Sequence, residues 1–146
     1  MRNVINSIAI ATTPERAIHA FLDPDLLQGW WGVERSLVEA QSGGPYTLAW
    51  GITNNGIQYI STGIVQDYQP GQRLLVGCYV YLNPERPFLG AQELEVTAAK
   101  MQEGCLLTVR QGPYPENAGA EWDWFYEAVV DAWPQVLRTL QEFLEK

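Results

Sequence analysis

The chain ends on the stretch AGAEWDWFYEAVVDAWPQVLRTLQEFLEK, residues 118–146, and this stretch decides the fold. Its apolar side chains recur every three or four residues, with acidic and other polar residues between them. The apolar set is Trp122, Phe125, Tyr126, Val129, Trp133, Val136, Leu137, Leu140 and Leu144. This spacing predicts one long helix whose apolar face lies on another layer of structure. Pro134 predicts a kink after about Ala132, and the apolar pattern continues through it in phase.

Most of the sequence before this helix is typical of short β-strands separated by turns. A first strand is expected at 4–11, followed by a helix that begins at Thr12-Thr13-Pro14-Glu15 and a second short helix at 25–28. Further strands are expected at 33–40, 45–52, 57–68, 73–82, 89–101 and 105–111. Consecutive short hairpins predict an antiparallel meander, because parallel pairs need long crossover connections. We therefore expect an α+β fold, with a curved antiparallel sheet of six or seven strands wrapped around the C-terminal helix.

The composition is that of one globular domain spanning residues 1–146. Hydrophobic residues make up 47% of the chain and charged residues 18%, which excludes disorder. The formal net charge of −8 argues against nucleic acid and anionic membrane surfaces as partners. No apolar run reaches membrane-spanning length, and the N-terminus lacks the pattern of a secretory signal. We expect a cytoplasmic monomer or homodimer.

The cysteine and histidine content offers little for catalysis or metal binding. Cys78 and Cys105 lie in apolar strand sequence and are expected to be reduced, buried thiols. In a meander the strand that holds Leu94 separates them, which places them too far apart for a disulfide. His19 is the only histidine, so no Ser-His-Asp set, Cys-His set or usual metal-ligand set can be assembled without it. We expect no catalytic residue, metal or cofactor.

Several short motifs carry a family resemblance over essentially the whole chain. They are Asp23-Pro24-Asp25-Leu26-Leu27 followed by Trp30-Trp31-Gly32; Gly43-Gly44-Pro45-Tyr46; Gly56, Gly63-Ile64-Val65, Pro70 and Arg73-Leu74; and Asp131-Ala132-Trp133 with Leu137 and Leu140. In this order they resemble the SRPBCC superfamily (START-like, birch-pollen-allergen-like), and within it the homologues of the activator of the 90-kDa heat-shock-protein ATPase. Ala132 departs from that branch, which usually has glycine there.

The resemblance implies a helix-grip fold with a deep cavity between the sheet and the C-terminal helix. Members of the superfamily bind lipids, hormones or polyketides, some are cyclases or hydratases, and some act on chaperones. Fold alone does not select among these activities.

A set of aromatic and apolar side chains is the candidate ligand site. It comprises Trp31, Tyr46, Leu48, Trp50, Tyr59, Tyr79, Tyr81, Trp122, Tyr126, Val129 and Trp133. For each member alone, a plain core is the favoured interpretation. Together they favour a cavity, because a buried tyrosine needs a partner for its hydroxyl and apolar walls with a few hydroxyls are typical of small-molecule pockets. The mouth of the cavity is expected near Trp31, whose flanking glycines would let it move.

The sequence is compatible with three functions. The leading hypothesis is a protein that binds a lipid-like, aromatic or polyketide-like molecule without catalysis. The alternatives are a cyclase or hydratase that uses pocket tyrosines, and a chaperone-interaction module. A charged side chain pointing into the cavity would favour an enzyme. Glu93 and Glu95 do not meet this criterion in the prediction, because they alternate with apolar residues and are expected on the solvent side of the sheet. Any of Arg35, Arg73 and Arg110 that faced inward would anchor a ligand carboxylate.

Overall fold

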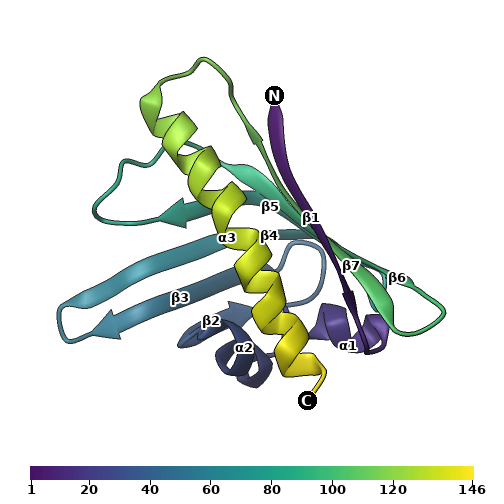
Figure 1. The fold of residues 1–146 in the computed structure, drawn as a ribbon. Helices are drawn as coiled ribbons and strands as arrows, with labels where there is room; N and C mark the ends of the chain where they lie inside the picture. Colours follow the sequence, from purple (N-terminus) through teal and green to yellow (C-terminus); the bar gives the residue numbers. More distant parts are fainter.

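A seven-stranded antiparallel sheet forms the frame of the protein in the computed structural model, which describes residues 1–146 (Figure 1). The strands are β1 (Arg2–Ile10), β2 (Arg35–Val38), β3 (Pro45–Thr53), β4 (Gly56–Gln69), β5 (Arg73–Leu82), β6 (Gln92–Lys100) and β7 (Cys105–Tyr114). The helices are α1 (Pro14–His19), α2 (Pro24–Trp31) and α3 (Ala120–Leu144). The strand order β1-β7-β6-β5-β4-β3-β2 is a meander in which β1 joins the far edge beside β7. The predicted antiparallel fold is confirmed.

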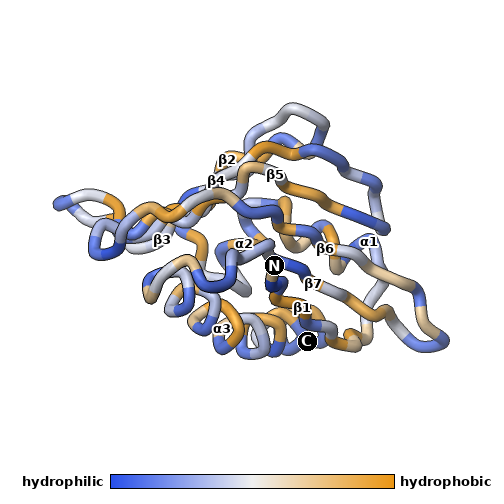
Figure 2. Tube along the Cα trace, turned by 90° about the horizontal axis from the view of Figure 1, so that it is seen from above, coloured by the Kyte–Doolittle hydropathy of each residue, from blue (hydrophilic) through white to orange (hydrophobic).

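The long helix α3 crosses the concave side of the sheet. Figure 2 shows the curved sheet lying over α2 and α3. The apolar stripe explains this placement, since Trp133, Leu137, Leu140 and Leu144 are all buried. The helix continues through Pro134 as one element, so the two halves of the stripe act as a single face. No helix has the length and apolar character needed to cross a membrane.

Local capping fixes the corner between β1 and β2. Thr13 caps α1 by accepting a hydrogen bond from the backbone N–H of Arg16, and Asp23 caps α2 by accepting from two backbone N–H groups. Gly32 ends α2 in the left-handed conformation, with φ of 70°, which glycine adopts without strain. The α1–α2 corner covers one end of the inner sheet face, where Phe21 and Leu27 are fully buried.

The strand limits differ from the sequence prediction mainly near Pro113. The prediction ended the last strand at Gln111, because Gly112-Pro113 is a typical breaker. The structure continues β7 to Tyr114, with a bulge opposite β1 between the pairs Arg2–Tyr114 and Val4–Gln111. A bulge tolerates proline, because the extra residue leaves the ladder of hydrogen bonds. It also turns the Tyr114 side chain into the core.

The two cysteines follow the prediction in position but only partly in burial. β6, which holds Leu94, lies between the strands of Cys78 and Cys105, and both thiols are free. Cys105 is buried as expected. Cys78 is exposed, because a bulge in β5 between Val76 and Tyr79 turns it outward with a positive φ of 47°. The prediction that both thiols are buried is therefore wrong for Cys78.

The outer face of the sheet carries a network of ion pairs. Glu95 accepts hydrogen bonds from Arg73 at 2.7 Å and from Arg110 at 3.3 Å. Arg73 also donates to Asp67 at 2.9 Å, and Arg110 to Glu93 at 3.0 Å. The prediction that both glutamates face away from the apolar side is confirmed. The two arginines are paired there and do not point toward a ligand.

Glu95→Gln is expected to lower the free energy of unfolding at neutral pH by about 1 kcal/mol, the upper range for a partly exposed ion pair. Burial by itself raises the pKa of Glu95. The hydrogen bonds from Arg73 and Arg110 and the charges of these arginines lower the pKa by more than burial raises it, so the pKa of Glu95 in the folded protein lies below the ordinary 4.5. A carboxylate of this kind stabilises the fold above its unfolded pKa and loses that contribution as the pH falls through its folded pKa. The difference between wild type and variant should therefore shrink below about pH 4.5.

Urea unfolding at neutral pH and at about pH 3 measures this effect. Glu127→Gln is the matched control, because Glu127 is exposed on α3 and forms no ion pair. The control should match wild type at both pH values. An equal loss for Glu95→Gln at both pH values would show that the ion pairs are not its cause.

Candidate functional site

An open cavity of about 720 Å³ lies between the sheet and α3, and we term it the sheet–helix cavity. Its walls are mostly aromatic and aliphatic. From α2 and the sheet side it is lined by Trp31, Gly32, Glu34, Trp50, Gly51, Gln58, Tyr59, Ser61, Tyr79, Tyr81 and Gln111. From α3 it is lined by Trp124, Phe125, Ala128, Val129, Ala132, Trp133 and Val136. Strands β3, β4 and β5 thus supply one wall and a single face of α3 supplies the other.

Seven of the residues proposed from the sequence come together in this cavity. They are Trp31, Trp50, Tyr59, Tyr79, Tyr81, Val129 and Trp133. On β3 and β4, Trp50 and Tyr59 are directly paired across the strands. Tyr59 stacks on Tyr81 of β5 with ring centroids 6.0 Å apart, so three neighbouring strands form one aromatic wall.

Tyr46 and Leu48 lie in the core instead of the cavity wall, which corrects the sequence prediction. Both are fully buried, and the Tyr46 hydroxyl donates a hydrogen bond to the backbone oxygen of Phe21 at 2.8 Å. Burial raises the pKa of Tyr46 well above its ordinary value. The cause of the difference is the α1–α2 corner, which covers this end of the inner face of β3 and leaves only the Trp50 end open.

Trp122 and Tyr126 also lie outside the cavity walls. Both rings pack edge-on against Tyr114, at centroid distances of 6.3 Å and 5.6 Å, and Arg2 lies over the Tyr126 ring at 4.4 Å. They occupy the row of α3 that faces β1 and β7. The cavity side of α3 also includes Trp124, so the prediction is correct for Val129 and Trp133 and wrong for Trp122 and Tyr126.

Sequence reasoning missed the α3 residues that make space for the cavity. Ala128 and Ala132 are four residues apart, in the same row as Trp124 and Val136, and all four line the cavity. Two alanines beside large aromatic residues leave room where bulky side chains would meet the sheet. This small-residue row was the available sequence signal.

Trp31, where the sequence predicts the mouth of the cavity, packs among other tryptophans. Its ring stacks on Trp30 at 5.0 Å and packs at an angle against Trp50 at 5.3 Å and Trp133 at 5.6 Å. The Trp50 indole N–H donates to the backbone oxygen of Trp31 at 3.1 Å. Trp30 is buried and its own N–H donates to the backbone oxygen of Ala20 at 2.8 Å. Trp30 therefore anchors α2 while Trp31 faces the cavity; whether Trp31 moves remains a prediction.

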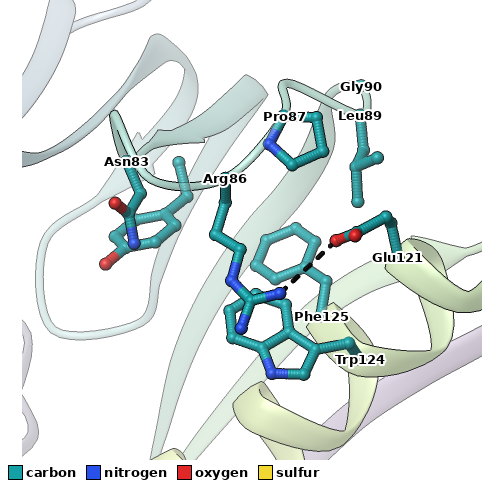
Figure 3. A pocket seen from close by; sticks show the side chains of 9 residues that line it. Asn83, Arg86, Pro87, Leu89, Gly90, Glu121, Trp124 and Phe125 are labelled. Atoms are coloured by element: carbon teal, nitrogen blue, oxygen red, sulfur yellow. Dashed lines mark ion pairs between the residues drawn. The ribbon is translucent and has the colours of Figure 1, made fainter.

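The other end of the cavity is covered by the β5–β6 loop. Figure 3 shows the Arg86 guanidinium lying over the indole of Trp124, at 3.7 Å from the ring centroid. Arg86 also forms an ion pair with Glu121 at 3.6 Å. Trp124 and Phe125 line both the hollow under this loop and the sheet–helix cavity. A cation–π contact and one exposed ion pair thus hold the loop against α3.

The polar groups of the cavity are mostly uncharged. Burial raises the pKa of both Tyr79 and Tyr81 to about 12, although the Ser61 hydroxyl partly offsets the rise at Tyr79. Both phenols therefore stay protonated at neutral pH and serve as hydrogen-bonding groups. Glu34 is the one charged side chain among the lining residues, and it is exposed at the rim, where it accepts a hydrogen bond from the backbone N–H of Ile52 at 2.6 Å.

The remaining candidates lie away from the cavity. His19 is exposed on α1, 3.7 Å from Asp23, and Arg35 is exposed on β2. No group of three or more His, Cys, Asp or Glu side chains is placed to hold a metal ion.

A family model described as "Activator of Hsp90 ATPase homolog 1-like protein" matches residues 11–145. The chain belongs to this family. The Hsp90 ATPase activator homologue 1-like proteins are part of the SRPBCC superfamily, so the resemblance seen in the sequence motifs is confirmed. A search of curated proteins found no match to the chain.

Solved structures share the same helix-grip fold over nearly the whole length of this family member. Protein MLL2253 from Mesorhizobium loti is 19% identical with a TM-score of 0.76, covering 98% of this chain and 96% of its own. Protein CV1439 from Chromobacterium violaceum is 24% identical with a TM-score of 0.73, covering 100% and 99%. The Aha1 dimer from Colwellia psychrerythraea is 19% identical with a TM-score of 0.70, covering 99% and 97%. At these identities the likeness shows the fold alone.

Proposed function

We propose that this protein binds an uncharged apolar or aromatic small molecule in the sheet–helix cavity. The observation that carries the proposal is the cavity of about 720 Å³ between α3 and the aromatic wall of β3–β5. Ligand pockets have volumes of roughly 300–1,000 Å³, and their walls are mainly apolar with a few placed polar groups. Tyr59, Tyr79, Tyr81 and Ser61 supply such groups here.

The character of the polar groups supports binding over catalysis. Tyr79 and Tyr81 hold their protons at neutral pH, so neither is a base. Glu34 lies at the exposed rim, and its Oε2 accepts from a backbone N–H. The cavity interior therefore offers apolar contact and neutral hydrogen bonds.

Ala128→Phe is expected to weaken binding of uncharged aromatic compounds at least tenfold, roughly 1.4 kcal/mol. Ala128 lines the α3 side of the cavity, so a benzyl group placed there occupies the ligand's space. Because the cavity is open, the added ring should leave the melting temperature near that of wild type. Quenching of tryptophan fluorescence measures binding, since Trp31, Trp50 and Trp133 all line the cavity.

Ala120→Phe is the matched control, because Ala120 begins α3 at an exposed position outside the cavity. It should bind as wild type does. If no uncharged aromatic or fatty compound binds the wild type, the cavity is not a binding site. If Ala128→Phe and Ala120→Phe bind equally well, ligands bind elsewhere on the protein.

A further inference from the structure

The floor of the sheet–helix cavity contains one amide whose orientation is fixed. Gln111 on β7 is 6% exposed and lines the cavity. The Trp133 indole Nε1–H donates a buried hydrogen bond to Gln111 Oε1 at 2.9 Å. An indole N–H can only donate, so the amide atom that it meets must be the oxygen. The Gln111 Nε2 group is therefore the free end of the amide.

Further uncharged hydrogen-bonding groups surround Gln111 on the inner face of the sheet. Tyr79 and Ser61 line the cavity beside it, and Gln92 is directly paired with Tyr79 across β5 and β6. Gln92 is 3% exposed, yet neither its Nε2 nor its Oε1 has a hydrogen-bond partner within the protein. The Tyr114 hydroxyl is likewise buried and unpaired. Gln92 and Tyr114 do not line the cavity, so the hydrogen-bonding groups of this cluster that are open to a ligand there are those of Gln111, Tyr79 and Ser61.

We propose that the cavity selects aromatic molecules that carry a neutral carbonyl group, and that Gln111 Nε2 donates a hydrogen bond to the carbonyl oxygen. This inference rests on the proposed binding function. Because the Trp133 N–H already bonds to Gln111 Oε1, the atom of this amide that has no partner is the donor Nε2. The matching ligand atom is an acceptor.

The acceptor is a neutral carbonyl and not a carboxylate, because the cavity supplies no cation. Glu34 is the one charged lining residue, and it carries a negative charge. Burying an unpaired carboxylate is far less favourable than burying a ketone that accepts one hydrogen bond. Arg73 and Arg110, which would pair with an anion, lie on the outer face of the sheet.

Three probes with one ring system test this selection. They are 2-acetylnaphthalene, 2-ethylnaphthalene and 2-naphthoate, which have similar shapes but carry a ketone, no oxygen and a carboxylate. Isothermal titration calorimetry gives the affinities, and the side-chain amide resonances of ¹⁵N-labelled protein report on Gln111. We expect the ketone to bind more tightly than the carboxylate and to shift the Gln111 amide resonances more than the ethyl compound does.

Gln111→Met removes the donor while keeping the length of the side chain. It should lower the affinity for the ketone about tenfold, the effect of one hydrogen bond, and change that for 2-ethylnaphthalene less than about twofold. Gln72→Met is the matched control, because Gln72 is exposed and does not line the cavity. It should leave both affinities near those of wild type.

Gln111→Met leaves the Trp133 N–H without an acceptor, so its folding must be checked. If it does not fold, the double variant Gln111→Met/Trp133→Phe removes both partners and leaves no unpaired group. In that background the ketone should lose its advantage over the ethyl compound. Equal losses for both probes, or tightest binding of 2-naphthoate, would overturn the carbonyl assignment and leave the binding function standing. Failure of all three probes would overturn the carbonyl assignment, and failure of every other uncharged aromatic or fatty compound as well would overturn the binding function.

Discussion

Leu48→Ala should lower the free energy of unfolding by about 2–5 kcal/mol, the range for truncating a buried leucine. Leu48 is fully buried on β3, opposite Ser61 of β4, under the cover of the α1–α2 corner. Truncation removes apolar contacts and leaves a void that the packed surroundings only partly fill. Affinity for cavity ligands should change less than about threefold, well under 1 kcal/mol, because Leu48 does not line the cavity.

Urea unfolding and ligand titration on the same preparation separate these two effects. Leu37→Ala provides the control, because Leu37 is 66% exposed on β2 and the substitution is the same. Surface changes of this kind are usually within about 0.5 kcal/mol of wild type. A Leu48→Ala protein that unfolds like wild type but loses binding would place Leu48 in the ligand site, as the sequence first indicated.

The overall fold could be predicted because its signals are local. Turn residues at regular spacing separated the strands, and three- and four-residue recurrence identified α3. The buried and exposed faces of β6 could also be predicted, because Glu93 and Glu95 alternate with Leu94 and Val96, which are fully buried. The bulge that exposes Cys78 could not be predicted, because an extra residue in one strand is recognised only when the pairing with the neighbouring strand is known.

The site could be predicted only in part, because its limits depend on how separate elements cover one another. Alternation places Tyr46, Leu48 and Trp50 on one face of β3, and nothing in that pattern says which of them another element covers. The α1–α2 corner packs over Tyr46 and Leu48, which excludes these two side chains from the cavity. On α3 the apolar stripe is several rows wide, so the sequence left open which row faces the cavity. Trp124 was missed because it lies outside the apolar set that the spacing assigned to this stripe.

Trp50→Ala should weaken binding of uncharged aromatic ligands by roughly 30-fold, about 2 kcal/mol, the effect typical of a large aromatic contact in a binding site. Trp50 lies two residues after Leu48 on the same face of β3, but its ring lines the cavity and packs against Trp31. Its truncation removes part of the wall and also the hydrogen bond to the backbone oxygen of Trp31. Because Trp50 is only half-buried, we expect a stability loss of about 1–3 kcal/mol, below the range for fully buried tryptophan.

The comparison of Trp50→Ala with Leu48→Ala distinguishes a cavity wall from a core. Equilibrium unfolding and titration with an uncharged aromatic probe should show different patterns: Trp50→Ala loses both affinity and stability, whereas Leu48→Ala loses stability alone. Trp50→Phe should recover much of the affinity, because a phenyl ring restores part of the wall without the indole N–H. If both alanine variants lose stability alike and neither changes affinity, the aromatic wall of β3–β5 serves packing, and the binding function would have to lie on another surface.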